Sequence, residues 1–379
     1  MIDTIILTVP WQEYQILDHT QFNPPTHHVH EAGNMQTKHV NNALPSERKE
    51  GIYKPRLTIR RRYVASSVSI PLKIEFSVPK LLFGNNVDEL AESDFELVIR
   101  QLQRVLLTMS VRTTADALRQ AGVSALHVAK NIPLSSGYTA SYVIKELSKV
   151  NLTRKLDLSQ TDFRNEGKSL QYYAISHSFV LYDKVSDLNQ PKGRAIDKEQ
   201  LPQQFSLFHA LREDRLELLR MEVRLSNRTK LKSVLAAVGF GDQPTFASVF
   251  RRELWQRVLL KYWQDLIASR NLFLFEKVGT AQGTLRNIFA AQPDLKPKQA
   301  LYLIGLQLLV KEIGVRDLRK LLEKHAGTQT WQRISNDLRD LSVQARDTSL
   351  CEYVRDIEEC LSRFEPYRRA EPKSSTFLM

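Results

Sequence analysis

Strict alternation of apolar and polar residues in one short segment is the feature that most constrains this fold. From Leu219 to Leu225 the sequence reads Leu-Arg-Met-Glu-Val-Arg-Leu, so apolar residues fall at every second position. Successive side chains of a β-strand point to opposite faces, and this period of two predicts a strand with one buried face. The other face carries Arg220, Glu222 and Arg224. Such a strand needs a sheet that is covered on one side and open on the other.

Three further segments show the same two-sided pattern. They are residues 72–78, 155–159 and 178–184. Their polar sides carry Glu75, Asp157 and Tyr182, respectively. An amphipathic helix over residues 95–109, behind Ser93 as a cap, is expected to pack on the apolar side. We therefore predict an α+β fold, in which an antiparallel sheet has helices on one face.

The length and the change of pattern along the chain predict two folded parts and a tail. The chain has 379 residues, which is more than one ordinary core requires. Short alternating runs dominate the first part, whereas helical spacing dominates the second. We predict a catalytic sheet domain over 1–240, a mainly helical C-terminal domain over 245–365 with a candidate DNA-binding role, and a flexible tail over 366–379.

The charge balance favours a polyanionic partner. Lysine and arginine total 54 against 42 acidic residues, which gives a formal net charge of +12. DNA, RNA and acidic membranes all attract a basic surface through the same Coulomb term, so charge alone does not choose among them.

Three features favour a cytoplasmic protein that does not bind membranes. The first ten residues lack the pattern of a signal peptide. The longest nearly apolar stretch, from Ala300 to Val310, is too short to span a bilayer. Cys351 and Cys360 fall on opposite faces of one predicted helix, so no disulfide is expected.

The polar sides of the four strands favour a particular chemistry. If the strands share one sheet, Glu75, Asp157, Tyr182 and Glu222 converge on its open side. Carboxylates bind a hard divalent cation, the cation neutralises phosphate oxygens, and a tyrosine oxygen can attack in line. The cluster therefore indicates phosphodiester transfer. For any one strand alone, a solvated polar face is the ordinary explanation.

A resemblance to a known family adds specificity. The segment from Glu75 to Val87 reads Glu-Phe-Ser-Val-Pro-Lys-Leu-Leu-Phe-Gly-Asn-Asn-Val and resembles the gene II replication endonucleases of filamentous phages (inoviruses). The opening Met1-Ile2-Asp3 and the segments around Asp157, Tyr182 and Glu222 agree with that family in order and approximate spacing. The resemblance is patchy over residues 1–240 and faint beyond them.

The sequence around the tyrosine is also similar to a second group. Tyr182-Asp183-Lys184, followed downstream by an Arg-x-Glu strand, looks like the active stretch of one class of plasmid rolling-circle initiators. Asp183 is closer to these plasmid proteins than to the best-known phage enzyme.

The resemblance implies a rolling-circle replication initiator. Tyr182 would nick one strand at a specific origin, form a 5′-phosphotyrosine and a 3′-hydroxyl primer, and later rejoin the displaced strand. Glu75, Asp157 and Glu222 would bind Mg²⁺ or Mn²⁺, and Lys184 would contact the phosphate or the leaving group. Further DNA contacts would come from Lys80, Asn86, Lys155, Arg220 and Arg224.

The same resemblance implies the partners. These are phage or plasmid origin DNA, together with a host helicase and DNA polymerase in the cytoplasm of a bacterial host. The sequence has no Gly-x-x-x-x-Gly-Lys-Ser/Thr loop, so the host would supply unwinding. An oligomer is compatible with the sequence.

Two other classes of protein fit parts of the pattern. The main alternative is a non-catalytic origin-binding protein or repressor, which would show neither metal dependence nor covalent DNA. An RNA-binding protein ranks last, because Phe76 and Phe179 fall on the apolar sides of their strands and would not stack on bases.

Several motifs compete for the assigned roles. His28-Val29-His30 spells the His-hydrophobic-His metal motif of other nickases, but its loop-like context favours a surface histidine cluster. Tyr172 and Tyr173 compete with Tyr182 as the nucleophile, and the Tyr-Asp-Lys pattern favours Tyr182. Residues 308–324 have the outline of a DNA-reading helix-turn-helix, although an ordinary helical hairpin is the simpler interpretation.

Overall fold

The structure is a computed structural model of the chain. It describes residues 1–31, 37–64, 67–135, 137–150, 162–164, 168–188, 216–269, 272–277, 280–323, 325, 327–344 and 350–369. The strand predicted over 155–159, with Lys155 and Asp157, lies outside these residues.

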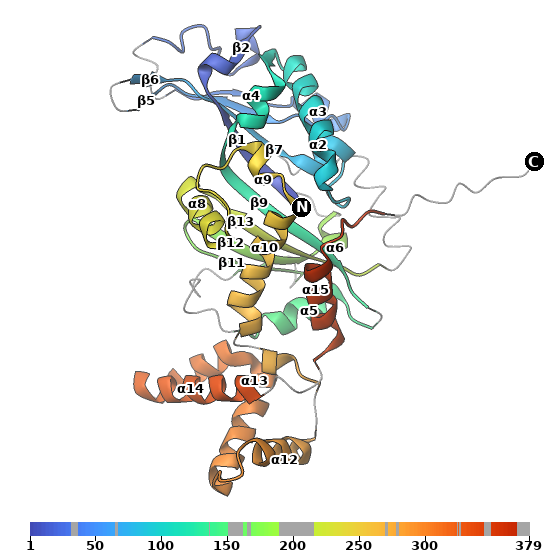
Figure 1. The fold of residues 1–379 in the computed structure, drawn as a ribbon, viewed down its shortest axis with the longest axis vertical. Coiled ribbons are helices and arrows are strands. Elements are labelled where there is room, and N and C mark those ends of the chain that lie inside the picture. The colour runs from blue at the N-terminus through green and yellow to red at the C-terminus, as the bar shows by residue number, and fades with distance from the viewer. Residues whose placement is uncertain are drawn as a thin grey trace, which may run out of the picture.

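A nine-stranded antiparallel sheet forms the centre of the described fold (Figure 1). Its strand order is β10-β11-β12-β13-β9-β1-β7-β4-β3. The strands are β1 (Ile2–Val9), β3 (His39–Asn41), β4 (Arg56–Ile59), β7 (Leu72–Ser77), β9 (Gly122–Pro133), β10 (Asp162–Arg164), β11 (Ser169–Tyr173), β12 (His177–Asp183) and β13 (Leu218–Leu225). The predicted α+β class is confirmed, and three of the predicted strands are β7, β12 and β13.

Two short strand pairs lie outside this sheet. Strand β2 (Tyr14–Ile16) pairs with β8 (Val111–Thr113), and β5 (Arg62–Val64) pairs with β6 (Ser67–Ser69). Both pairs lie at the end of the molecule opposite the C-terminal helices (Figure 1).

Helices cover the apolar side of the sheet, as predicted. Four of them lie on the strands at its centre and on the β11–β12 side (Figure 1): α5 (Ala140–Leu147), α8 (Arg228–Ala237), α10 (Arg252–Trp263) and α15 (Glu352–Arg363). Under them, the alternating apolar residues of β9 and β13, such as Val128 and Val223, are fully buried. Burial of each such side chain contributes about 1.5–3 kcal/mol.

Further helices pack around the sheet. They are α1 (Pro45–Lys49), α2 (Val78–Phe83), α3 (Phe95–Thr108), α4 (Ala115–Gln120), α6 (Lys184–Leu188) and α9 (Phe246–Val249). One of them, α6, lies on the polar side, where Leu188 packs with Leu218. Helix α3 is the amphipathic helix predicted over 95–109, and it buries Val98, Ile99, Leu102 and Leu106. The predicted Ser93 cap is wrong, because the N-cap residue is Asp94, whose carboxylate accepts a hydrogen bond from the Ala91 amide (2.8 Å).

The second half of the chain is helical, but it does not form a core separate from the sheet. Helices α10 and α15 both contact β9, so the predicted boundary near residue 240 separates patterns rather than cores. Helices α12 (Ala281–Ala291), α13 (Pro297–Glu323) and α14 (Thr328–Gln344) extend away from the sheet (Figure 1). No described helix has the length and apolar character needed to cross a membrane.

Helix α13 bends sharply inside the segment predicted as a helical hairpin. Gly314 has φ +84° and breaks the helix there. A Cβ at Gly314 would lie 2.9 Å from the Lys149 Cα, so glycine also permits this close approach. The two halves of α13 are thus joined by a single residue that docks on the segment after α5.

The beginning of the predicted tail is bound. The Glu89 amide donates to the Tyr367 carbonyl (2.8 Å), and the Tyr367 amide donates to the Glu89 carboxylate (2.9 Å). Arg368 forms an ion pair with Asp94 at 2.7 Å. Residues 366–369 therefore belong to the folded structure, and residues 370–379 lie outside the described part.

Candidate metal centre and nucleophile

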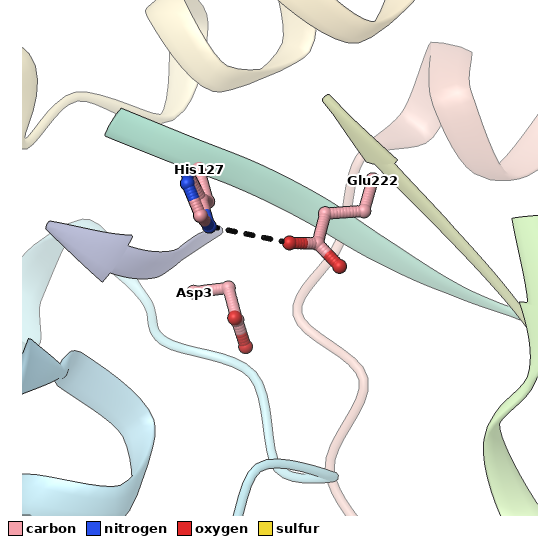
Figure 2. A group of neighbouring side chains, drawn as sticks. All are labelled: Asp3, His127 and Glu222. Carbon is pink, nitrogen blue, oxygen red and sulfur yellow. Dashed lines mark ion pairs between the residues drawn. The ribbon is translucent and has the colours of Figure 1, made fainter. Parts of the chain in front are cut away.

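Three potential metal ligands converge on the polar side of the sheet (Figure 2). Asp3 lies on β1, His127 on β9 and Glu222 on β13, which are three consecutive strands. One ligand atom from each side chain lies within 4.8 Å of the other two. The His127 Nδ1 is 3.5 Å from the Glu222 Oε1. The group is partly accessible, because the side chains of His127 and Asp3 are 24% and 14% exposed.

A β-bulge gives Asp3 its direction. Ile2 is opposite Val128 and Thr4 is opposite His127, so β1 has one extra residue between these pairs. If regular alternation continued back from Thr8 and Thr4 without a bulge, Asp3 would point toward the covered side. The bulge instead leaves Ile2 in the core and Asp3 beside His127, as bulges commonly do when they redirect a side chain.

Glu222 is held as a carboxylate. Burial alone would raise its pKa, but the positive charge of Arg224 and hydrogen bonds from His127 and Arg224 lower the pKa well below its usual value. Arg224 donates from Nε to Oε1 (2.8 Å) and from Nη2 to Oε2 (3.0 Å). A deprotonated, oriented carboxylate is the form that binds a metal ion.

Asp3 is oriented by its neighbours in a similar way. Arg220 donates from Nη2 to the Asp3 Oδ1 (2.5 Å), and the Thr4 hydroxyl donates to Oδ2 (3.0 Å). Arg220 is 0% exposed, and its Nη1 also donates to the Asn86 carbonyl (2.8 Å) and to the Asn131 Oδ1 (3.1 Å). The guanidinium therefore links β13, β9, β1 and the segment after α2.

The donor set fits a hard or borderline divalent cation. Two carboxylates and one imidazole suit Mn²⁺ and accommodate Mg²⁺. Each carboxylate has about four lone-pair positions, so its hydrogen bonds to arginine leave positions for an ion. The arginines then hold the ligands as outer partners, in the way that supporting hydrogen bonds orient ligands in metal sites.

Tyr182 lies on the same polar side, on β12. It is directly opposite Arg220, and Glu222 is its diagonal neighbour two residues along β13. Its side chain is half-buried. Burial raises the pKa of the hydroxyl well above its usual value, and the charge of Arg220 opposes this shift. A cation at the three-ligand group would add a second positive charge beside the phenol.

The two residues after Tyr182 have structural contacts. Asp183 accepts hydrogen bonds from the Ser186 amide (2.9 Å) and hydroxyl (2.6 Å) and so holds the first turn of α6. Lys184 is 0% exposed, its Nζ lies 5.8 Å from the centre of the Tyr182 ring, and Asp187 is 3.8 Å away. Lys184 is thus buried next to the Tyr182 ring, and this burial argues against direct contact with a phosphate.

The structure does not bring Glu75 into the group of ligands. Glu75 lies on the same polar side, opposite Ile6 of β1 and Arg56 of β4. Three strand spacings, about 14 Å, separate β7 from β13, which is too far for one ion to bind both carboxylates. Of the three predicted metal ligands, Glu222 lies in the group, Glu75 lies apart, and Asp157 is outside the described residues.

The predicted DNA contacts have different environments. Arg220 is fully buried and Lys80 is 8% exposed, so neither presents its charge on the surface. Asn86 uses its carbonyl to hold Arg220, and Arg224 is bound to Glu222 but remains one-third exposed. Lys155 lies outside the described residues. Burial therefore argues against Arg220 as a direct DNA contact.

Two of the competing candidates, Tyr172 and the His28-Val29-His30 motif, lie elsewhere. Tyr172 is on the covered side of β11 and is 2% exposed, which removes it from the open face. His28 and His30 belong to a turn, and the His28 Nδ1 is 2.5 Å from the Glu31 carboxylate. As predicted, this motif is a surface histidine cluster and not a pair of metal ligands on a strand.

Two residues of the site were missed from the sequence. Asp3 belongs to the opening segment that resembles the phage family, but the alternation of residues there did not predict on which side of the strand its side chain lies. His127 stands between Leu126 and Val128, and this short alternation was the available signal for a polar-side histidine.

Comparisons with protein-family models, with curated proteins and with solved structures find no match.

Proposed function

We propose that the protein is a metal-dependent enzyme that nicks and rejoins DNA, of the rolling-circle initiator type. The observation that carries this proposal is the position of Tyr182 on the polar side of the sheet that also carries Asp3, His127 and Glu222, with Glu222 as its diagonal neighbour on β13. A tyrosine hydroxyl next to a cation-binding group suits attack on a phosphodiester. The formal net charge of +12 suits a DNA substrate.

The reaction conserves the number of phosphate ester bonds. The Tyr182 oxygen forms a bond to phosphorus, and the bond from phosphorus to the 3′ oxygen breaks. The phenolic proton leaves Tyr182, and the departing oxygen becomes a 3′-hydroxyl that can prime synthesis. The 5′ phosphate stays on Tyr182, and attack by a 3′-hydroxyl on this ester reverses the step and joins two ends.

The residues of the chain have separate tasks in this reaction. Asp3, His127 and Glu222 would hold Mg²⁺ or Mn²⁺, which supplies charge to neutralise the phosphate oxygens. Arg220 stabilises the phenolate, because its charge favours the deprotonated form of Tyr182. Lys184 adds positive charge at the ring. The substrate would be phage or plasmid origin DNA in a bacterial cytoplasm, with a host helicase and polymerase.

The test is detection of the covalent intermediate. Single-stranded oligonucleotides that tile the DNA around the gene are labelled at the 3′ end and incubated with protein and Mn²⁺ or Mg²⁺. The proposal predicts labelled protein on a denaturing gel, and 5′ label on a shorter free strand. Tyr182→Phe should abolish the labelled protein. Tyr172→Phe, the same change on the covered side of the neighbouring strand, should retain it.

Two results would contradict the proposal. Equal labelling of the wild-type protein and Tyr182→Phe would place the nucleophile elsewhere. Tight binding of one tile without cleavage, with or without metal, would favour the non-catalytic origin-binding protein or repressor.

A further inference from the structure

A second polar cluster lies on the polar side of the sheet, on the strands that follow β1. Strands β7 and β4 follow β1 in the sheet order. On their polar side, Lys73 lies opposite Thr8 and Thr58, and Glu75 lies opposite Ile6 and Arg56. Neighbouring strands are about 4.8 Å apart, so this cluster begins within two strand spacings of Asp3.

Positive charges gather around Lys73. Burial lowers the pKa of Lys73, and the charges of Arg62 and Lys38 lower it further, whereas Glu75 opposes the shift. Arg62 and Lys38 are exposed, and Lys73 is half-buried. Like charges held close together raise the energy of the free protein, and a bound anion would offset this repulsion.

Two side chains lie between this cluster and the metal centre. Ser77 lies opposite Thr4, the residue after Asp3, but it is 3% exposed and so is closed to a DNA backbone. Arg56 lies opposite Glu75, one step further from the centre, and is half-buried. Its buried Nε has no hydrogen-bond partner in the part of the chain that the structure describes. The guanidinium has further N–H donors, and phosphate oxygens are strong acceptors for them.

We propose that Arg56, Lys73, Arg62 and Lys38 form a phosphate strip, which binds the backbone of a single DNA strand on one side of the scissile phosphate. The inference rests on the proposed function, because Tyr182 and the three ligands define where the scissile phosphate lies. The strip lies on β7, on β4 and on the segments beside them, on the side of Asp3 away from Tyr182. A single strand can follow such a row of cations, since cationic surfaces track an unpaired backbone without reading its sequence.

The test measures binding without chemistry. All proteins carry Tyr182→Phe, and EDTA is present, so neither cleavage nor metal contributes. Affinity for fluorescent single-stranded oligonucleotides is measured over a range of salt for Lys73→Gln and Arg62→Gln. Arg104→Gln, which removes an equal charge from an exposed position of α3 on the covered side, is the control. Circular dichroism checks that each variant is folded.

The strip variants should each weaken binding several-fold and reduce the salt slope by about 0.7, the value for one phosphate contact on a single strand. The control should show neither effect. The loss should occur with oligonucleotides extended from the nick site in one direction and not in the other.

Three results would overturn the inference. They are equal effects of the strip variants and Arg104→Gln, equal losses for extensions in both directions, and equal competition by duplex DNA of the same length. Failure of the proposed function would appear separately, as the absence of labelled protein with wild-type Tyr182 and metal, because this binding assay does not depend on cleavage.

Discussion

Tyr182 of β12 is paired directly opposite Arg220 of the adjacent strand β13, and Arg220 in turn donates a 2.5 Å hydrogen bond to Asp3 of β1. The buried Arg220 therefore neighbours the predicted nucleophile and also holds a potential metal ligand. The two parts of the site are coupled, because displacement of Arg220 would change the charge near Tyr182 and the orientation of Asp3 together.

Metal binding should depend on Asp3 and His127 and not on Glu75. Asp3→Asn and His127→Gln each remove one ligand from the group, so Mn²⁺ affinity should fall by tenfold or more, roughly the loss caused by even outer-shell changes. Glu75→Gln should leave the affinity unchanged, since Glu75 lies three strands from Glu222. Titration of free Mn²⁺ by electron paramagnetic resonance measures all three variants.

Glu75→Gln is also the control for charge, because it neutralises one carboxylate on the same side of the sheet. A large loss of Mn²⁺ affinity in this variant, with Asp3→Asn unaffected, would restore the ligand set implied by the family resemblance.

Alkaline conditions should affect Tyr182 in two measurable ways. Its folded-state pKa lies above the unfolded value of about 10, so its contribution to stability is complete below pH 10 and is lost as pH rises further. Urea unfolding between pH 8 and 11 should therefore show a smaller loss of stability in Tyr182→Phe than in the wild type. In single-turnover assays, formation of labelled protein should rise with pH by about tenfold per unit while the phenol is protonated.

A stability difference of the opposite sign would show that the hydroxyl is not held in a protonated form by burial. A flat rate profile between pH 7 and 9 would show that loss of the phenolic proton does not limit attack.

Arg220→Lys should destabilise the protein without removing a DNA contact. Lysine cannot present the planar fork that serves Asp3, the Asn86 carbonyl and Asn131, so buried acceptors lose their donors. We expect a loss of about 1–3 kcal/mol in the free energy of unfolding. The salt slope of DNA binding should stay unchanged, because Arg220 is not exposed. A slope reduced by about 0.7, with normal stability, would instead support direct contact with DNA.

The bound C-terminal segment should stabilise the site from outside the sheet. Glu89 accepts hydrogen bonds from the Tyr367 amide (2.9 Å) and from the Asn131 amide (2.5 Å), and Asn131 also accepts from Arg220. Truncation after Arg363 should lower the melting temperature by about 5 °C, whereas truncation after Arg369 should leave it unchanged. Differential scanning fluorimetry compares the two.

The two truncations show whether residues 364–369 contribute to stability and whether the residues after Arg369 do not. Equal melting temperatures for both would show that residues 364–369 contribute nothing to stability. A loss of stability with full Mn²⁺ affinity would show that the connection from Glu89 through Asn131 does not reach Asp3.

Alternation predicted the strands that are half-buried in a regular way, and it failed where regularity is broken. Strands β7, β12 and β13 alternate, so their polar residues were placed on the correct side. In β9, Lys130 occupies the covered side and is neutralised there by Glu89 at 2.6 Å, which hides the period of two. His127 was therefore missed together with its strand.

The distance between Glu75 and Glu222 could not be predicted for another reason. Alternation gives the side of a strand on which a residue lies, but it does not give the order of strands in the sheet. Glu75 and Glu222 share a side, yet β9 and β1 lie between their strands. Sequence order gave no sign of this separation, because β7 and β13 are brought to their places by contacts between segments far apart in the chain.

The bulge at the start of β1 means that the centre depends on how this strand pairs as well as on its side chains. Regular pairing continued back from Thr4 would turn the Asp3 carboxylate toward the helices and Ile2 toward the polar side. Two related chains could then carry the same aspartate, histidine and glutamate and differ in metal binding because only one of them keeps the bulge. When relatives of this protein are compared, the local pairing of the first strand is therefore as informative as the presence of the acidic residue.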